Sequence, residues 1–228
     1  MEVDMRCLCF LIFIVLVFPA TAQAGEGNIA KCLSSLKYYK KALQERSDFN
    51  SEVLDSMAGQ LGLENSLSEG DWKLLRRFFE NQDELSPSGS KQDANSCIGL
   101  GISSANMKIL NKISLEQIPS PIDKVARQCA EGIGITIAYY EHKYPKQVAF
   151  DKATELGNWF GSGLAFYKHL AVTPPSVEAH DLPVIAEKAV SKIMSSESEA
   201  EFVGQLKASL DACEWLGMDT MGIYQTLK

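Results

Sequence analysis

Three neighbouring residues in the last third of the chain carry side chains that could do chemistry together. Glu178, His180 and Asp181 lie within four positions of one another. Carboxylates and imidazoles bind divalent metal ions and transfer protons, so this trio is the candidate metal centre of a hydrolase. The same residues are typical of a solvated loop in which Asp181 caps the next helix, and we favour that interpretation.

Other catalytic motifs are incomplete. Three glycine pairs, at 99–101, 132–134 and 161–163, begin like a phosphate-binding G-x-G-x-x-G loop, but each lacks the third glycine and falls inside an expected helix. The sequence contains no nucleophile elbow, H-E-x-x-H or P-loop motif. We therefore predict no catalytic residue and no cofactor. Glycine weakens a helix interior, so we expect these pairs to allow close approach of helix backbones.

Aromatic residues offer a second kind of site. Trp159 and Phe166 are seven positions apart, which places them on one face of a helix, and Phe160 and Tyr167 follow the same spacing. This spacing is typical of core packing. The alternative is a helical cavity, also lined by the pair Tyr139–Tyr140, that carries a small apolar ligand.

The N-terminus has the three parts of a secretory signal peptide. Arg6 precedes an apolar run at 8–18, and Ala22-Gln23-Ala24 fits the cleavage rule. The run is shorter than the roughly 20 residues that span a bilayer. We predict a signal peptide at 1–24, a mature single helical domain at 25–228, a secreted or periplasmic location and no stable membrane anchor after cleavage.

Four of the six cysteines lie beyond this signal: Cys32, Cys97, Cys129 and Cys213. An even number in an oxidising compartment predicts two disulfides. Sequence does not determine the pairing; among the three possibilities we favour Cys97–Cys129 with Cys32–Cys213, which would join the first helix to the last. Zinc binding is disfavoured because no C-x-x-C pair exists.

The charges indicate a protein partner. The chain has a net charge of −7 and no basic patch interleaved with aromatic residues, which disfavours nucleic acid. Basic residues nevertheless gather in the first helix of the mature chain. Lys37, Lys40 and Lys41 are our candidates for docking an acidic partner, although a solvated helix face would have the same composition.

Hydrophobic periodicity predicts an all-α fold. Apolar residues at three- and four-residue steps define a helix over 29–46, and Ser68 with Asp71 resembles a capping box before the next apolar run. Further start and stop signals predict helices near 51–62, 94–113, 121–142, 145–169, 183–195 and 198–217, with a short one after Asp219. We expect an irregular or orthogonal bundle of eight or nine helices, stabilised by disulfides, with an exposed loop at 86–93.

The short segment Cys97-Ile98-Gly99 and the small residues after it are similar to exported helical immunity proteins, which protect bacteria against toxins delivered to the periplasm. The resemblance covers half a turn of helix. It favours a non-enzymatic exported protein that binds another protein, in an inhibitor, immunity-type or accessory role. The alternatives are the carrier of a small apolar ligand and the metal-dependent hydrolase.

Overall fold

The computed structural model describes residues 26–80, 93–118, 121–194 and 199–227. In these ranges the chain forms ten α-helices and two short 3-10 helices, with one isolated β-bridge and no strand. The prediction of an all-α fold is confirmed, whereas the expected count of eight or nine helices is wrong. The predicted signal peptide at 1–24, most of the predicted loop at 86–93 and the residues 195–198 lie outside the described residues.

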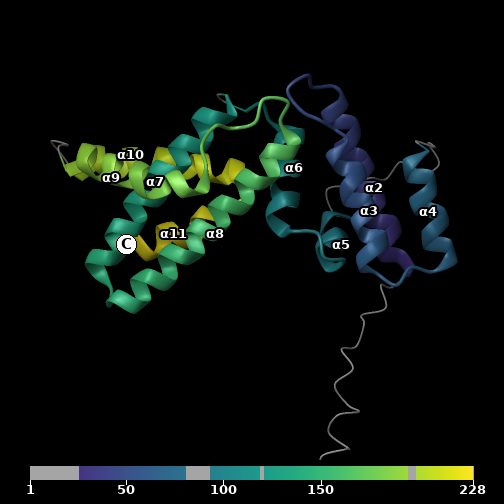
Figure 1. The fold of residues 1–228 in the computed structure, drawn as a ribbon, viewed down its shortest axis with the longest axis horizontal. Coiled ribbons are helices and arrows are strands. Elements are labelled where there is room, and N and C mark those ends of the chain that lie inside the picture. Colours follow the sequence, from purple (N-terminus) through teal and green to yellow (C-terminus); the bar gives the residue numbers. More distant parts are fainter. Residues whose placement is uncertain (1–25, 81–92, 119–120, 195–198, 228) are drawn as a thin grey trace, which may run out of the picture.

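Helices gather at two ends of an elongated molecule (Figure 1). We define the first unit as α2–α6 and the second unit as α7–α11. The first unit comprises α2 (Glu26–Gln44), α3 (Val53–Glu64), α4 (Glu69–Phe79), α5 (Ala94–Gly99) and α6 (Ser104–Leu115). The second comprises α7 (Ile122–Lys143), α8 (Lys146–Leu170), η2 (Ala179–Asp181), α9 (Leu182–Met194), α10 (Glu199–Cys213), η3 (Glu214–Leu216) and α11 (Thr220–Leu227).

The first helix of each unit forms its centre. α2 packs against α3, α4, α5 and α6, and α7 packs against α8, α9, α10 and α11. The apolar stripe expected on the first helix is buried, with each member at most 1% exposed: Ile29, Cys32, Leu33, Leu36, Tyr39 and Leu43. Ser68 and Asp71 form the capping box that starts α4, as predicted.

The expected single helix over 94–113 is two helices. Gly101 adopts a φ of 98°, in the left-handed region that favours glycine, and this ends α5 before α6 begins. The amide of Ile102 donates to the carbonyl of Cys97 at 3.0 Å, which satisfies the end of α5. The sequence pattern predicted one continuous helix through Gly101. The turn at Gly101 divides that helix in two, which is why the expected number of helices was too low.

All four cysteines form disulfides, but the favoured pairing is wrong. Cys32 in α2 bonds to Cys97 in α5, and Cys129 in α7 bonds to Cys213 at the end of α10. The Cα atoms of each pair are 4.7 Å apart. Each disulfide therefore closes within one unit, because α5 and α10 pack along the first helix of their own unit, and no disulfide joins the two units.

Noncovalent contacts join the units. Phe49 and Ala171 form the isolated antiparallel bridge, supported by hydrogen bonds from the Asn50 amide to the Leu170 carbonyl (2.7 Å) and from the Val172 amide to the Asp48 carbonyl (3.0 Å). α6 lies between the two ends of the molecule in Figure 1 and packs against α8 and η3 of the second unit. The last helix of the first unit is therefore also part of the junction.

Candidate functional site

The predicted metal trio lies at the protein surface, at and just before η2. The carboxylates of Glu178 and Asp181 are bonded to different partners, so the three side chains do not converge on one point. Both carboxylate oxygens of Glu178 accept hydrogen bonds from the Lys168 ammonium at 2.6 Å. Asp181 accepts from the Glu178 amide at 2.9 Å and thereby caps η2, while the side chain of His180 is 81% exposed. Within the described residues no group of three His, Cys, Asp or Glu side chains, this trio included, is placed to hold a metal ion.

The three lysines of the first helix are not one docking face. The Lys40 ammonium lies 2.7 and 2.9 Å from the two carboxylate oxygens of Asp55 in α3, and 5.6 Å from the centre of the Phe78 ring in α4. Lys40 is therefore an internal link between three helices, which does not favour its role in docking. Lys41 is exposed and Lys37 is half-buried. The docking role of the three lysines stays a prediction.

The aromatic cluster is mostly core. Phe160 and Tyr167 are fully buried and Phe166 is 6% exposed. Trp159 differs, since it is 40% exposed and lines a pocket of about 240 Å³ together with Tyr140. This volume is below the roughly 300–1,000 Å³ of pockets that enclose drug-sized ligands. The other walls come from α8, from α11 and from Asp219 just before α11. Three of these lining residues are charged, namely Lys152, Glu155 and Asp219, and the others are Leu156, Gly222 and Ile223.

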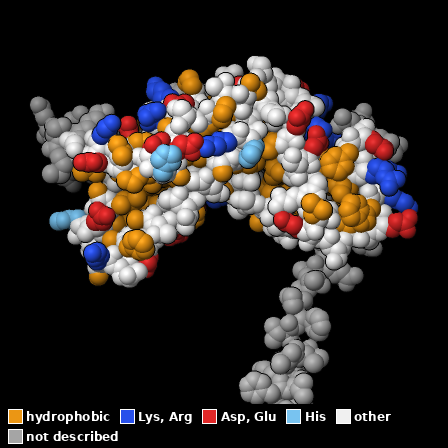
Figure 2. Space-filling model, viewed as in Figure 1, with side chains coloured by type: hydrophobic (Ala, Val, Ile, Leu, Met, Phe, Trp, Pro, Cys, Tyr) orange, Lys and Arg blue, Asp and Glu red, His pale blue; other side chains and the backbone are white. Residues whose placement is uncertain are grey.

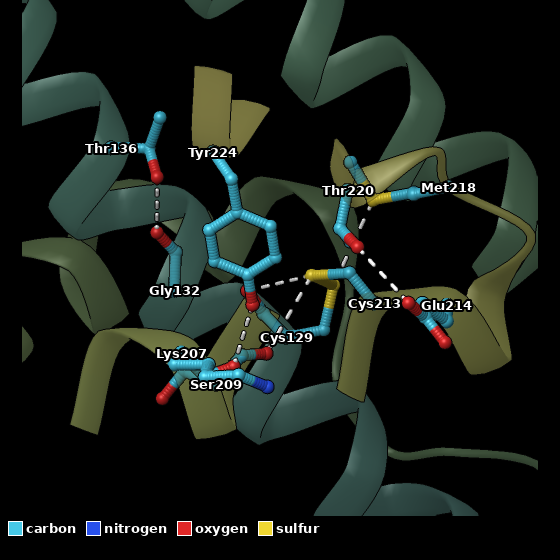
Figure 3. Close-up of a disulfide and its surroundings, with 10 residues drawn as sticks. All are labelled: Cys129, Gly132, Thr136, Lys207, Ser209, Cys213, Glu214, Met218, Thr220 and Tyr224. Carbon is cyan, nitrogen blue, oxygen red and sulfur yellow. Dashed lines mark hydrogen bonds between the residues drawn. A yellow bond between two sulfur atoms is a disulfide. The ribbon is translucent and has the colours of Figure 1, made fainter. Parts of the chain in front are cut away.

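The surroundings of the second disulfide are fixed by hydrogen bonds (Figure 3). The Tyr224 hydroxyl lies 3.0 Å from the Lys207 carbonyl, as Figure 3 shows, and it donates to the Asp211 carboxylate at 2.9 Å. Burial, together with this bond to Asp211, raises the pKa of the Tyr224 phenol above its usual range. Burial opposes ionisation of Asp211, but hydrogen bonds from Lys207 and Tyr224 outweigh it and lower the pKa of that carboxyl. These groups hold α11 against α10.

A surface that the sequence analysis missed lies on α4. Trp72 and Phe79 are seven residues apart and therefore share one side of the helix, where they are 49% and 46% exposed. Arg76 lies one turn from each of them on the same side and is also exposed. We name Trp72, Arg76, Phe79 and the exposed Lys73 the α4 face. Figure 2 shows hydrophobic side chains over this end of the molecule with both basic and acidic side chains beside them.

The neighbouring helix α3 keeps the Trp72 and Phe79 rings at the surface. Gly62 of α3 faces Trp72, and an added Cβ there would lie 3.1 Å from the indole ring, while Gly59 faces the tip of Phe79 at 3.9 Å. The rings therefore lean on a flat glycine-bearing side of α3 instead of entering the core. The spacing Trp72–Arg76–Phe79, with aromatic and basic side chains on one side of a helix, was the available sequence signal.

Comparisons with known proteins identify no relative. No protein-family model, no curated protein and no solved structure matches the chain. Among the described helices, none is both long and apolar enough to cross a membrane.

Proposed function

We propose that this chain is an exported, non-enzymatic helical protein that binds another protein, with the α4 face as its docking surface. The observation that carries the proposal is the joint exposure of Trp72, Arg76 and Phe79 on one side of α4. Tryptophan and arginine are the residue types most enriched among those that dominate binding energies in protein interfaces. Aromatic residues in general are enriched at the centres of such interfaces.

The chemistry of the α4 face specifies the partner. Half-exposed rings supply apolar area, and Arg76 places positive charge at its border, while the ammonium of Lys73 pairs with Glu69 at 3.1 Å. The matching surface is an apolar pocket or groove bordered by carboxylates, because complementary charge directs encounter and excludes wrong partners. An inhibitor or immunity-type protein that covers an acidic site on another exported protein would have this character.

Export rests on two independent observations. The sequence at 1–24 has the layout of a signal peptide, and the four remaining cysteines form disulfides, which persist in oxidising compartments. The carrier and hydrolase alternatives have less support. The aromatic pocket is small for an apolar cargo, and the carboxylates of Glu178 and Asp181 are already engaged by Lys168 and by the cap of η2.

The test is quantitative affinity capture with the mature protein from its own exported compartment. Wild type is compared with Trp72→Ala and Arg76→Ala, and with Phe150→Ala as the matched control. Phe150 is an aromatic residue of α8 that is 65% exposed and lies outside the α4 face. The partner that supports the proposal is recovered with wild type and with the control and is lost with both α4 variants.

Titration of each variant with the purified partner then measures how far Kd changes. A residue that dominates binding costs at least about 2 kcal/mol on truncation, so we expect Kd to rise roughly 30-fold or more for Trp72→Ala. Equal binding by Trp72→Ala and Phe150→Ala would overturn the α4 face as the docking site. So would tryptophan-dependent binding to vesicles of phosphatidylcholine and phosphatidylglycerol in the absence of a protein partner.

A further inference from the structure

The two units are built from the same parts in the same order. Each has five α-helices, and in each the first helix is disulfide-bonded to the fourth: α2 to α5, and α7 to α10. The fifth helix of each unit, α6 or α11, packs on the first and fourth helices of its own unit. The glycine pairs at 99–101, 132–134 and 161–163 do not follow this order.

The turn after the second cysteine of each disulfide repeats in sequence and in geometry. Cys97-Ile-Gly-Leu-Gly101-Ile matches Cys213-Glu-Trp-Leu-Gly217-Met, so that a Leu-Gly pair follows each cysteine at the same distance. Gly101 and Gly217 both have positive φ, 98° and 75°. In both turns the amide of the next residue donates to the cysteine carbonyl, at 3.0 and 3.2 Å. This equivalence pairs each residue of one turn with a residue of the other.

α6 is the helix of the first unit that docks on the second, beside the bridge between Phe49 and Ala171. Gly217 faces the backbone of Ala105 in α6 so closely that an added Cβ would lie 2.5 Å from the Ala105 carbonyl oxygen. The Lys112 ammonium lies 3.0 Å from the Glu214 carboxylate and 4.9 Å from the centre of the Trp215 ring. The receiving surface of the second unit is therefore the turn formed by η3 and Gly217.

The counterparts of these two surfaces are partly open. In the first unit, Ile98 and Gly99 correspond to Glu214 and Trp215; Ile98 is 38% exposed, and nothing lies within 4 Å of a Cβ added at Gly99. Gly101, the counterpart of Gly217, faces the Glu64 carboxylate, 3.2 Å from an added Cβ, so the open part of this turn is its Ile98–Gly99 edge. In the second unit, Met221 of α11 corresponds to Ala105 and is 65% exposed. Among the described residues, the turn at 98–101 of the first unit therefore has no helix from another unit docked on it. Likewise, α11 of the second unit is not docked on a turn of another unit.

We infer that these two open surfaces bind one another between two copies of this chain. α11 of one copy docks on Ile98 and Gly99 at the turn of the next, in the way that α6 docks on η3 within the chain. Met221 and Ile98 supply apolar contact, and Ile98 takes the place that Glu214, the ion-pair partner of Lys112, has in the internal junction. Such a head-to-tail contact leaves one free surface of each kind on every dimer, so it extends to longer chains as concentration rises.

The association is weaker than the internal junction. Ile109 of α6 is fully buried, whereas its counterpart in α11, Gln225, is exposed and polar. Two copies must also lose translational and rotational freedom, which two units of one chain do not. We therefore expect reversible, concentration-dependent assembly.

The test is sedimentation velocity of the mature protein over a wide concentration range. Gly99→Glu places a charge on the receiving turn and has open space around it, and Met221→Glu places a charge on α11. Val184→Glu is the control, since Val184 is 56% exposed on α9 and belongs to neither surface. We expect wild type and the control to form dimers and larger species, and each of the other two variants alone to stay monomeric, with unchanged circular dichroism.

Mixing the two monomeric variants gives the decisive measurement. Each retains one intact surface, so an equimolar mixture should form one-to-one dimers and nothing larger. A mixture that stays monomeric, or a wild type that is monomeric at every concentration, overturns the inference. Neither result bears on the α4 face, whose variants carry both assembly surfaces unchanged.

Discussion

A close contact between two helices of the second unit predicts, from its geometry, whether one substitution raises or lowers stability. Gly134 of α7 packs against Ala186 of α9, and a Cβ added at Gly134 would lie 2.4 Å from both the Cα and the Cβ of Ala186. The Cα belongs to the backbone, so no side-chain rotation relieves the overlap. Overpacking a well-packed site costs about 1–3 kcal/mol, and alanine returns about 1 kcal/mol over glycine in a helix.

Gly134→Ala should therefore lower the free energy of unfolding by about 2 kcal/mol, taking the upper end of the overpacking range because the clash is with backbone. For a chain of this size that corresponds to a fall in Tm of about 4–8 °C. The assay is urea unfolding with both disulfides intact, followed by far-ultraviolet circular dichroism and tryptophan fluorescence.

The matched control is Gly157→Ala in α8. Nothing lies within 4 Å of a Cβ added there, so only the helix preference acts and stability should rise by about 0.5–1 kcal/mol. The two substitutions are chemically identical, but we expect them to change the free energy of unfolding in opposite directions. A Gly134→Ala variant as stable as wild type, beside a control that behaves as expected, would refute the close approach of α7 and α9.

Four further predictions concern stability. Replacing either pair of bonded cysteines with alanine should cost up to about 4 kcal/mol from the lengths of the closed loops, measured by urea unfolding. Lys40→Ala should cost about 1–2 kcal/mol because it leaves a partly buried carboxylate unpaired, whereas Lys41→Ala should stay within about 0.5 kcal/mol of wild type in the same assay. Tyr167 is fully buried and its hydroxyl has no hydrogen-bond partner among the described residues, so Tyr167→Phe should raise Tm. Hydrogen bonds from Ser176 lower the pKa of the Asp123 carboxyl in the folded protein. The contribution of this carboxylate to folding stability is therefore complete above about pH 4 and is lost as the pH falls through the lowered pKa. Asp123→Asn should flatten the fall in Tm on acidification in that window.

Local patterns in the sequence predicted local structure well. The buried stripe of α2 and the capping box of α4 depend on residues within one or two turns, and both are present. The explanation of the helical glycines is confirmed where two helices cross, at Gly132, which meets the backbone of α10, and at Gly134. It is wrong at Gly99, where nothing lies within 4 Å of an added Cβ, and at Gly101, where a left-handed turn and not helix packing requires glycine.

Long-range features could not be predicted because they depend on which helices meet. Four cysteines allow three pairings, and the choice follows from α5 and α10 lying along the first helix of their own unit. Lys40 looked like a member of a basic surface because the carboxylate that it meets, Asp55, is on another helix. The exposure of Trp72 likewise depends on the flat side of α3, which an isolated helical pattern does not reveal.

The placement of the disulfides makes each unit covalently self-contained. Both ends of the first disulfide precede α7, and both ends of the second follow α6. A single proteolytic cut between α6 and α7 would therefore yield two fragments that separate on a denaturing gel without reductant, whereas the pairing Cys32–Cys213 would have kept them joined. A unit that carries its own cross-link can be duplicated, lost or exchanged as a module without leaving an unpaired thiol in its neighbour.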